Sequence, residues 1–135
     1  MTAPNPESLA GRDLIQVFLP CADLARSVAF YRDVLGLPFL FETNGMAFFQ
    51  LGASRLMLGQ LREGQSLRGE GLSGGVYLDA PDLPALAAAL EARGVTFRGP
   101  AQALQKTEAG ELMLRSFLDP DGNLVALMGV VAGQA

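Results

Sequence analysis

The feature that most constrains the fold is an internal repeat of one strand–helix pattern. The first copy begins Gln16-Val-Phe-Leu-Pro-Cys-Ala-Asp23, and the second begins Gly75-Val-Tyr-Leu-Asp-Ala-Pro-Asp82. Gly75 and Asp82 each lie 59 residues after their counterparts, and each copy continues into a helical pattern that ends at a glycine. A repeat of this length indicates two copies of one supersecondary unit that pack together.

The first copy predicts one strand, one helix and three further strands. The short apolar run 14–19 is typical of a strand, and Asp23 is placed as the N-cap of the following helix. Apolar residues then recur at helical spacing until Gly36, which suits a helix C-terminus. The further strands are expected at 39–41, 46–51 and 55–58.

The second copy predicts the same order of elements. A strand is expected at 75–79, followed by a helix that Asp82 caps and Gly94 ends. Strands are expected at 95–98, 112–118 and 124–128, with an irregular segment at 99–110. The turn Asp119-Pro-Asp-Gly-Asn123 joins the last two strands, and we expect its two carboxylates to face solvent. Each copy is therefore predicted to be a βαβββ module.

Length and composition predict one domain. Its 135 residues suffice for a single core. We expect a flexible N-terminal tail at 1–11 and one domain at 12–130. Within it, module 1 covers about 12–59, a linker covers 60–73 and module 2 covers about 74–130.

The net charge and the hydropathy of the chain limit the kinds of partner and the location that we expect. The net charge of −4 argues against nucleic acid and anionic membranes as partners, and gives a weak preference for a cationic ligand. No apolar run approaches the roughly 20 residues of a spanning helix, and the N-terminus lacks the pattern of a secretory signal. We therefore expect a cytoplasmic protein. The single cysteine, Cys21, excludes an internal disulfide framework.

Two motifs resemble a known family. The stretch Asp23-Leu-x-Arg-Ser-x-x-Phe-Tyr-x-x-Val-Leu-Gly36 is similar to the first helix of the vicinal oxygen chelate superfamily, the group of glyoxalases, bleomycin resistance proteins and extradiol dioxygenases. The turn at Asp119–Asn123, followed by an apolar strand, resembles the C-terminal signature of that superfamily. The resemblance implies an α+β fold in which two βαβββ modules form curved mixed sheets around a central cavity. It also implies a homodimer. Because the superfamily includes several kinds of enzyme and proteins that only bind a drug, the fold does not settle the function.

The enzymes of this superfamily hold a metal ion on four inward side chains, usually His, Gln or Glu. The resemblance carries these positions onto Gln16, Met57, Gly75 and Ala126. Glycine and alanine offer no donor, a thioether is unsuited to Zn, Fe, Mn or Mg, and the chain contains no histidine. A shifted alignment would bring in Asp79 or Glu42 but no histidine. Because a catalytic divalent ion needs about three protein ligands, we expect no metal, no cofactor and no metal-dependent catalytic residues.

The remaining candidate site is the cavity between the sheets. Two-residue alternation along the strands predicts eleven inward residues: Gln16, Phe18, Phe48, Gln50, Met57, Tyr77, Asp79, Met113, Arg115, Phe117 and Met128. Apolar walls with a few polar groups are typical of pockets for small molecules. In the alternative interpretation the aromatic and methionine side chains are core filler, and Arg115 pairs with Glu111 or Asp119 at the sheet edge.

Three functions remain open. The leading hypothesis is a metal-free protein that binds a small organic molecule, such as an aromatic or antibiotic-like compound. The second is a glyoxalase-like lyase or isomerase, or a dioxygenase-like enzyme, with a non-standard site that uses Tyr77, Asp79, Arg115 or Cys21. The third is a non-catalytic structural or regulatory module whose cavity has collapsed.

Overall fold

A computed structural model describes residues 7–8, 10, 12–62, 64 and 75–132. The first module contains β1 (Gln16–Cys21), α1 (Leu24–Ala29), a π-helical segment η1 (Phe30–Val34), β2 (Phe39–Thr43), β3 (Met46–Leu51) and β4 (Ser54–Gln60). The second contains β5 (Gly75–Asp79), α2 (Leu83–Ala92), β6 (Gln102–Thr107), β7 (Gly110–Leu118) and β8 (Leu124–Ala132). Most of the expected tail and of the expected linker lie outside the described residues, so the predicted domain boundaries stay predictions.

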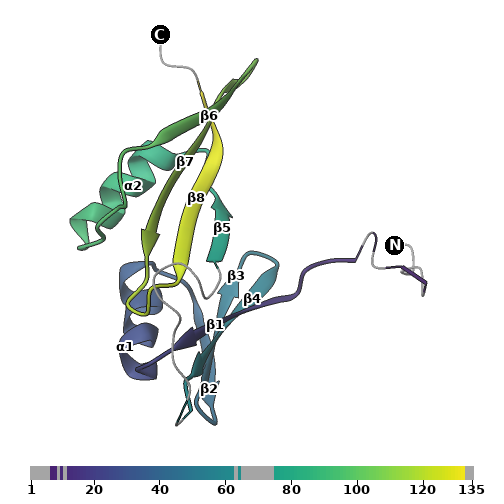
Figure 1. Ribbon diagram of the computed structural model, residues 1–135, viewed down its shortest axis with the longest axis vertical. Helices are drawn as coiled ribbons and strands as arrows, with labels where there is room; N and C mark the ends of the chain where they lie inside the picture. The colour runs from purple at the N-terminus through teal and green to yellow at the C-terminus, as the bar shows by residue number, and fades with distance from the viewer. Residues whose placement is uncertain (1–6, 9, 11, 63, 65–74, 133–135) are drawn as a thin grey trace.

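The two modules share one topology, which confirms the predicted fold class. The sheet orders are β1-β4-β3-β2 and β5-β8-β7-β6. In each sheet the first and last strands of the module pair in parallel, and the other pairs are antiparallel. The register places Phe18 opposite Met57 and Tyr77 opposite Ala126, so the matched positions of the repeat occupy matched places. The two sheets remain separate and do not close into a barrel (Figure 1).

The first expected helix changes from an α-helix to a π-helix halfway along its length. Asp23 caps it as predicted, because its carboxylate accepts a hydrogen bond from the Arg26 amide at 3.2 Å. From Phe30 onward the helix widens, and the Leu35 amide donates to the Phe30 carbonyl, five residues earlier. In the second helix the predicted cap by Asp82 is wrong, since Asp82 occupies the cap position without a side-chain hydrogen bond.

The expected strand at 95–98 is also wrong. Only an isolated bridge joins Phe97 to Phe117 there, and the regular strand β6 lies within the segment that was expected to be irregular. The reason is exposure: every β6 residue except Thr107 is exposed. An edge strand in water needs no hydrophobic alternation, so the sequence carries no strand pattern at this point.

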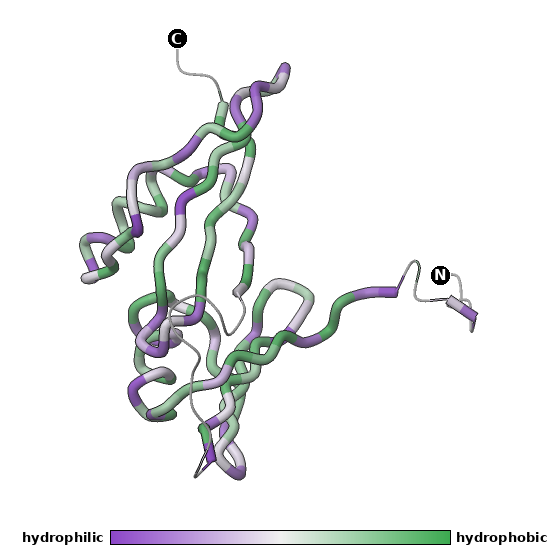
Figure 2. The backbone as a smooth tube through the Cα atoms, in the orientation of Figure 1, coloured by the Kyte–Doolittle hydropathy of each residue, from purple (hydrophilic) through white to green (hydrophobic). Residues whose placement is uncertain are grey.

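Each sheet buries one face against a helix. The core includes Leu19, Phe49 and Leu56 in the first module, with Val125 and Leu127 in the second. Helix α2 covers the second sheet, whereas α1 lies between the first sheet and the β7–β8 turn (Figure 1). Figure 2 shows the hydrophobic residues concentrated along β1 and β8, with a hydrophilic tip on the β6–β7 hairpin. No helix among the described residues is both long and apolar enough to cross a membrane.

The turn at Asp119–Asn123 joins the modules, and the expectation that its carboxylates face solvent is wrong. Asp119 and Asp121 are each 6% exposed. Asp119 accepts the Tyr31 hydroxyl at 2.7 Å. Asp121 accepts the Ala22 amide at 2.7 Å and forms an ion pair with Arg26 at 3.0 Å. Because these partners all belong to the first module, the turn attaches module 2 to the start of the first helix.

Candidate functional site

Each sheet has a second face that carries no helix, here called the open face. In the first sheet, the register places five predicted residues on it together: Gln16, Phe18, Phe48, Gln50 and Met57. In the second sheet the open face carries Tyr77, Asp79 and Met128 as predicted, together with Leu114, Ser116 and Ala126. The structure thus brings eight of the predicted residues onto the open faces.

The other three predicted residues lie on the opposite face, so their expected inward orientation is wrong. Phe117 is 1% exposed and contacts the Phe97 ring edge-to-face at 5.3 Å between centroids. The Arg115 guanidinium lies 4.2 Å from the Phe97 ring centroid and donates to the Gly99 carbonyl at 2.9 Å. Its ion-pair partner is Glu91 at 3.7 Å, rather than the expected Glu111 or Asp119. Met113 shares this face and packs against the core.

The error is a shift of one residue along β7, so sequence reasoning missed Leu114 and Ser116. Apolar residues occupy both faces of β7, and alternation therefore gives no direction. The internal repeat supplies the orientation of the β7 side chains that alternation does not give. Phe48 lies opposite Met57, and Ser116 lies opposite Ala126. Phe117 is consequently the counterpart of the buried Phe49 in the first module.

The open face of the first module is aromatic. Phe48 stacks on Phe41 at 4.5 Å between centroids, and the Arg55 guanidinium lies 5.3 Å from the Phe48 centroid. Phe18 is 52% exposed, and its ring lies so close to Gly59 that a Cβ there would collide with it. These rings form a partly exposed surface on which a planar molecule can stack.

Two polar residues of this face are already engaged within the protein. The Gln16 amide nitrogen lies 3.7 Å from the Met57 sulfur, to which it donates. The Gln50 amide donates to the Gly52 carbonyl at 2.6 Å and to the Ser54 carbonyl at 3.3 Å, which fastens the β3–β4 turn. Gln50 therefore stabilises its hairpin.

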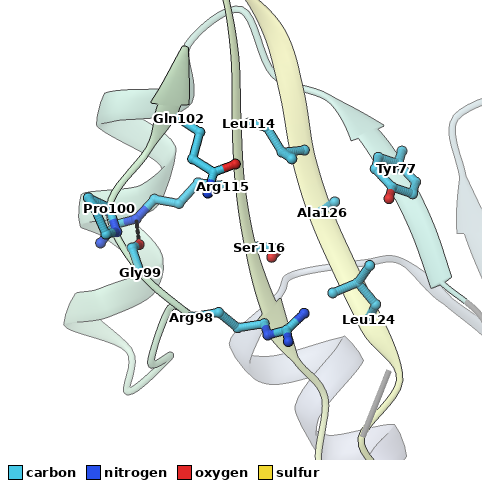
Figure 3. A pocket seen from close by; sticks show the side chains of 10 residues that line it. All are labelled: Tyr77, Arg98, Gly99, Pro100, Gln102, Leu114, Arg115, Ser116, Leu124 and Ala126. Carbon is cyan, nitrogen blue, oxygen red and sulfur yellow. Dashed lines mark hydrogen bonds between the residues drawn. The ribbon is translucent and has the colours of Figure 1, made fainter. Parts of the chain in front are cut away.

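The open face of the second module is hollowed. The second-module hollow has a volume of about 470 Å³ (Figure 3). Its floor is apolar, with Leu114, Leu124 and Ala126, and the polar groups Arg98 and Gln102 lie at its rim. The described residues that line it are Tyr77, Arg98, Gly99, Pro100, Gln102, Leu114, Arg115, Ser116, Leu124 and Ala126.

A second space, the intermodule hollow, lies between the two modules. It has a volume of about 530 Å³ and is lined by Leu14, Val17, Leu51, Gly52, Ser54, Gly75, Val76, Tyr77, Leu78 and Asp79. A smaller space of about 360 Å³ includes Tyr77, Asp79 and Met128. Tyr77, which is 61% exposed, borders all three spaces. It is therefore the central side chain of the candidate site.

The four positions that would hold a metal ion in this fold do not fit one. At Gly75 an added Cβ would meet the Leu124 carbonyl oxygen and Cβ, both at 2.9 Å. That position is therefore closed to any side chain unless the backbone shifts. Ala126 and Met57 supply a methyl group and a thioether, and Gln16 is turned toward Met57. Within the described part of the chain, no three His, Cys, Asp or Glu residues are grouped as a metal site requires.

Cys21 lies outside the open face. It is fully buried, and burial together with the negative charge of Asp121 raises the pKa of its thiol to about 11. Because the thiolate is the reactive form, burial and the raised pKa both disfavour reaction of this thiol at neutral pH. Burial also raises the pKa of the neighbouring Tyr31 above its ordinary value, and the charge of Asp119 adds to the shift.

Comparison with known proteins identifies relatives of the whole fold. A sequence model of the Glyoxalase/Bleomycin resistance protein/Dioxygenase superfamily matches residues 13–127. A search of curated proteins finds no match. A glyoxalase/bleomycin resistance protein/dioxygenase from Nocardioides has a similar structure, with a TM-score of 0.72 at 21% identity, covering 94% of this chain and 89% of the other.

Two further structures carry more specific descriptions. Lactoylglutathione lyase from Agrobacterium tumefaciens matches with a TM-score of 0.65 at 22% identity, covering 87% of this chain and 92% of the other. TnmS3, an antibiotic binding protein from Streptomyces sp. CB03234, matches with a TM-score of 0.69 at 24% identity, covering 91% of this chain and 99% of the other. At these identities the likeness establishes a shared fold.

Proposed function

This chain belongs to the Glyoxalase/Bleomycin resistance protein/Dioxygenase superfamily, and within it we propose that the protein is a metal-free binding protein for a small, partly aromatic molecule. The observation that carries the proposal is that positions whose side chains cannot coordinate a metal lie beside hollows. Ala126, one of the positions that would hold a metal, borders the second-module hollow, and Gly75, another, borders the intermodule hollow. At Ala126 this chain has a methyl group beside open space where an enzyme of this fold would have a metal ligand.

The chemistry of the open faces supports an aromatic ligand. Phe18 and Tyr77 are large aromatic side chains that stay more than half exposed, although burying such a ring stabilises a protein by about 1.5–3 kcal/mol. A planar molecule that stacks on them would recover part of this free energy. The antibiotic-binding TnmS3 shows that the same fold is compatible with this kind of function.

We propose that the protein binds its ligand as a homodimer. Leu14 and Ile15 are 69% and 74% exposed and directly precede β1, which carries the exposed Phe18. Leu14 and the exposed Tyr77 line the same hollow. Clusters of exposed apolar residues mark interaction surfaces in soluble proteins. A second copy that covers these residues would also enclose the open faces, which a single chain leaves accessible to water.

The other two functions find less support in the geometry. A lyase or isomerase would lose two of its four candidate residues, because Cys21 is buried with a raised pKa and the Arg115 guanidinium is engaged by Glu91 and the Gly99 carbonyl. A collapsed structural module is disfavoured by hollows of about 470 and 530 Å³, which lie within the usual range of ~300–1,000 Å³ for small-molecule pockets.

The test is calorimetric titration with 2-naphthamide as a neutral aromatic probe, with and without EDTA. We expect binding that EDTA leaves unchanged and that Phe18→Ala or Tyr77→Ala weakens about tenfold or more, which corresponds to about 1.4 kcal/mol. Leu104→Ala is the matched control, since Leu104 is 47% exposed and borders none of the three spaces described above. Binding that disappears with EDTA, or that all three variants weaken equally, would contradict the proposal.

A further inference from the structure

The second-module hollow contains a cation, the guanidinium of Arg98, that no described residue compensates. Phe97 turns its ring toward Phe117 on the helix side, so the next side chain, Arg98, points to the open face. The Arg98 amide donates to the Ser116 carbonyl at 2.8 Å, which fixes the backbone beside β7. Figure 3 shows the guanidinium extending over the sheet toward β8. Among the residues that the structure describes, the Arg98 side chain has neither a hydrogen bond nor an ion pair.

The charge of this hollow is opposite to that of the whole chain. Among the described residues, its lining contains two arginines and no aspartate or glutamate. Arg115 contributes little positive charge, because Glu91 and the Gly99 carbonyl engage its guanidinium. Arg98 is therefore the uncompensated charge, in a protein whose net charge is −4. A cleft lined by one sign of charge concentrates ligands of the other sign.

We propose that this hollow selects an aromatic anion, with its carboxylate on Arg98 and its ring system on the apolar floor beside Tyr77. The proposal rests on the small-molecule function above and adds the ligand's charge to it. A guanidinium holds a carboxylate through two parallel hydrogen bonds. The Ser116 hydroxyl lies between Arg98 and the middle of the hollow and supplies a further donor, whereas the Gln102 amide lies at the opposite end. The weak preference for a cationic ligand that the net charge suggests is thereby reversed at the site.

The experiment compares three probes of one shape: 2-naphthoate, 2-naphthamide and 2-naphthylmethylammonium. Titrations are run at physiological ionic strength, where the Debye length of about 8 Å screens distant charges. We expect naphthoate to bind about tenfold more tightly than naphthamide, and the ammonium compound to bind most weakly. Arg98→Gln should abolish the preference for the anion, so that naphthoate and naphthamide bind with similar affinity.

Arg93→Gln is the matched control. Arg93 is exposed at the end of α2 and is absent from the lining of the hollow, yet its substitution changes the net charge by the same amount. Equal loss of naphthoate affinity in both variants would overturn the proposal, as would equal binding of naphthoate and naphthamide to the unmodified protein. If naphthamide binds without any preference for naphthoate, only the ligand charge is refuted. If none of the three probes binds, the proposed function fails as well.

Discussion

The buried turn between β7 and β8 allows a sharp comparison of two nearly identical substitutions. Asp119→Asn and Asp121→Asn each replace a carboxylate with an amide of the same shape and remove one charge. Asp119 accepts four hydrogen bonds: from the Asp121 amide at 2.8 Å, the Asn123 amide at 2.9 Å, the Tyr31 hydroxyl at 2.7 Å and the Asn123 side chain at 2.9 Å. Every partner is a donor, so an NH₂ group at position 119 always faces donors.

Neither orientation of an asparagine at position 119 removes the conflict. On one side the NH₂ group meets two backbone N–H groups, which cannot reverse. On the other side the Tyr31 hydroxyl can rotate, but the Asn123 side chain also donates to the Pro20 carbonyl at 2.8 Å. Turning that amide would satisfy position 119 and lose the bond to Pro20. We therefore expect Asp119→Asn to lower the free energy of unfolding by about 2–4 kcal/mol, the sum of a lost hydrogen bond and an unsatisfied buried donor.

Asp121→Asn can avoid this conflict between the new NH₂ group and neighbouring donors. One Asp121 oxygen accepts the Ala22 amide and Arg26, and it can stay an oxygen in the variant. The other accepts only the Ser27 hydroxyl, which can rotate and accept from an NH₂ group instead. The lost ion pair with Arg26 is worth little, about 0–1 kcal/mol, because the Arg26 side chain is 50% exposed. We expect a total cost near 1 kcal/mol for this variant.

The measurement is urea unfolding followed by circular dichroism at one fixed protein concentration, since the proposed dimerisation would make stability depend on concentration. Asp82→Asn, at an exposed residue without a side-chain cap bond, controls for the change in net charge and should shift stability by less than about 0.5 kcal/mol. Equal costs at positions 119 and 121, or a larger cost at 121, would refute the assignment of donors and acceptors in this turn.

Three further predictions concern the buried thiol and the closed glycine position. The folded state retains the Cys21 proton to a pKa of about 11, whereas the unfolded chain releases it near the ordinary value of 9.0, so stability should fall by about 1.4 kcal/mol per pH unit across this range. Urea midpoints between pH 8 and 11 check this, and Cys21→Ala should flatten the slope, with the raised pKa of Tyr31 accounting for the remainder. Ellman's reagent should label Cys21 slowly in the native protein and rapidly in urea; fast native labelling would show that the thiol is accessible. Gly75→Ala should cost about 1–3 kcal/mol by overpacking against Leu124, whereas Gly99→Ala, with nothing within 4 Å of the added methyl group, should leave the thermal midpoint unchanged.

The repeat made most of the fold predictable from sequence. It predicts two βαβββ modules because the matched segments carry matched strand, cap and glycine positions, and both sheets follow that order. The open face of the first module was also predictable. On β1 the core-facing Leu19 and the open-face Phe18 alternate within one strand, and β4 continues the same alternation with Leu56 and Met57.

The sequence failed to predict features that depend on tertiary contacts. The burial of Asp119 and Asp121 arises from partners about a hundred residues earlier, and a turn rich in Asp, Pro and Gly is equally compatible with solvent. The orientation of Arg115 and Phe117 follows from packing against α2 and Phe97, which local alternation on β7 does not encode. Arg98 was not predicted as a site residue, because a single arginine beside Gly99 forms no local sequence pattern that indicates a binding site.

The differences between the two modules explain why the hollow lies in the second. At three matched positions the first module has Gln16, Phe48 and Met57, whereas the second has Gly75, Ser116 and Ala126. Ser116 and Ala126 are smaller than their counterparts and both border the hollow of about 470 Å³, so the second module has space where the first has a filled surface. Gly75 is absent from the lining of this hollow, and Leu124 occupies the space beside it. Glycine and alanine are also the residues that leave a metal ion without donors. Under the proposed function, Ala126 has two consequences: its methyl group offers no donor to a metal ion, and its small size leaves room for an organic molecule.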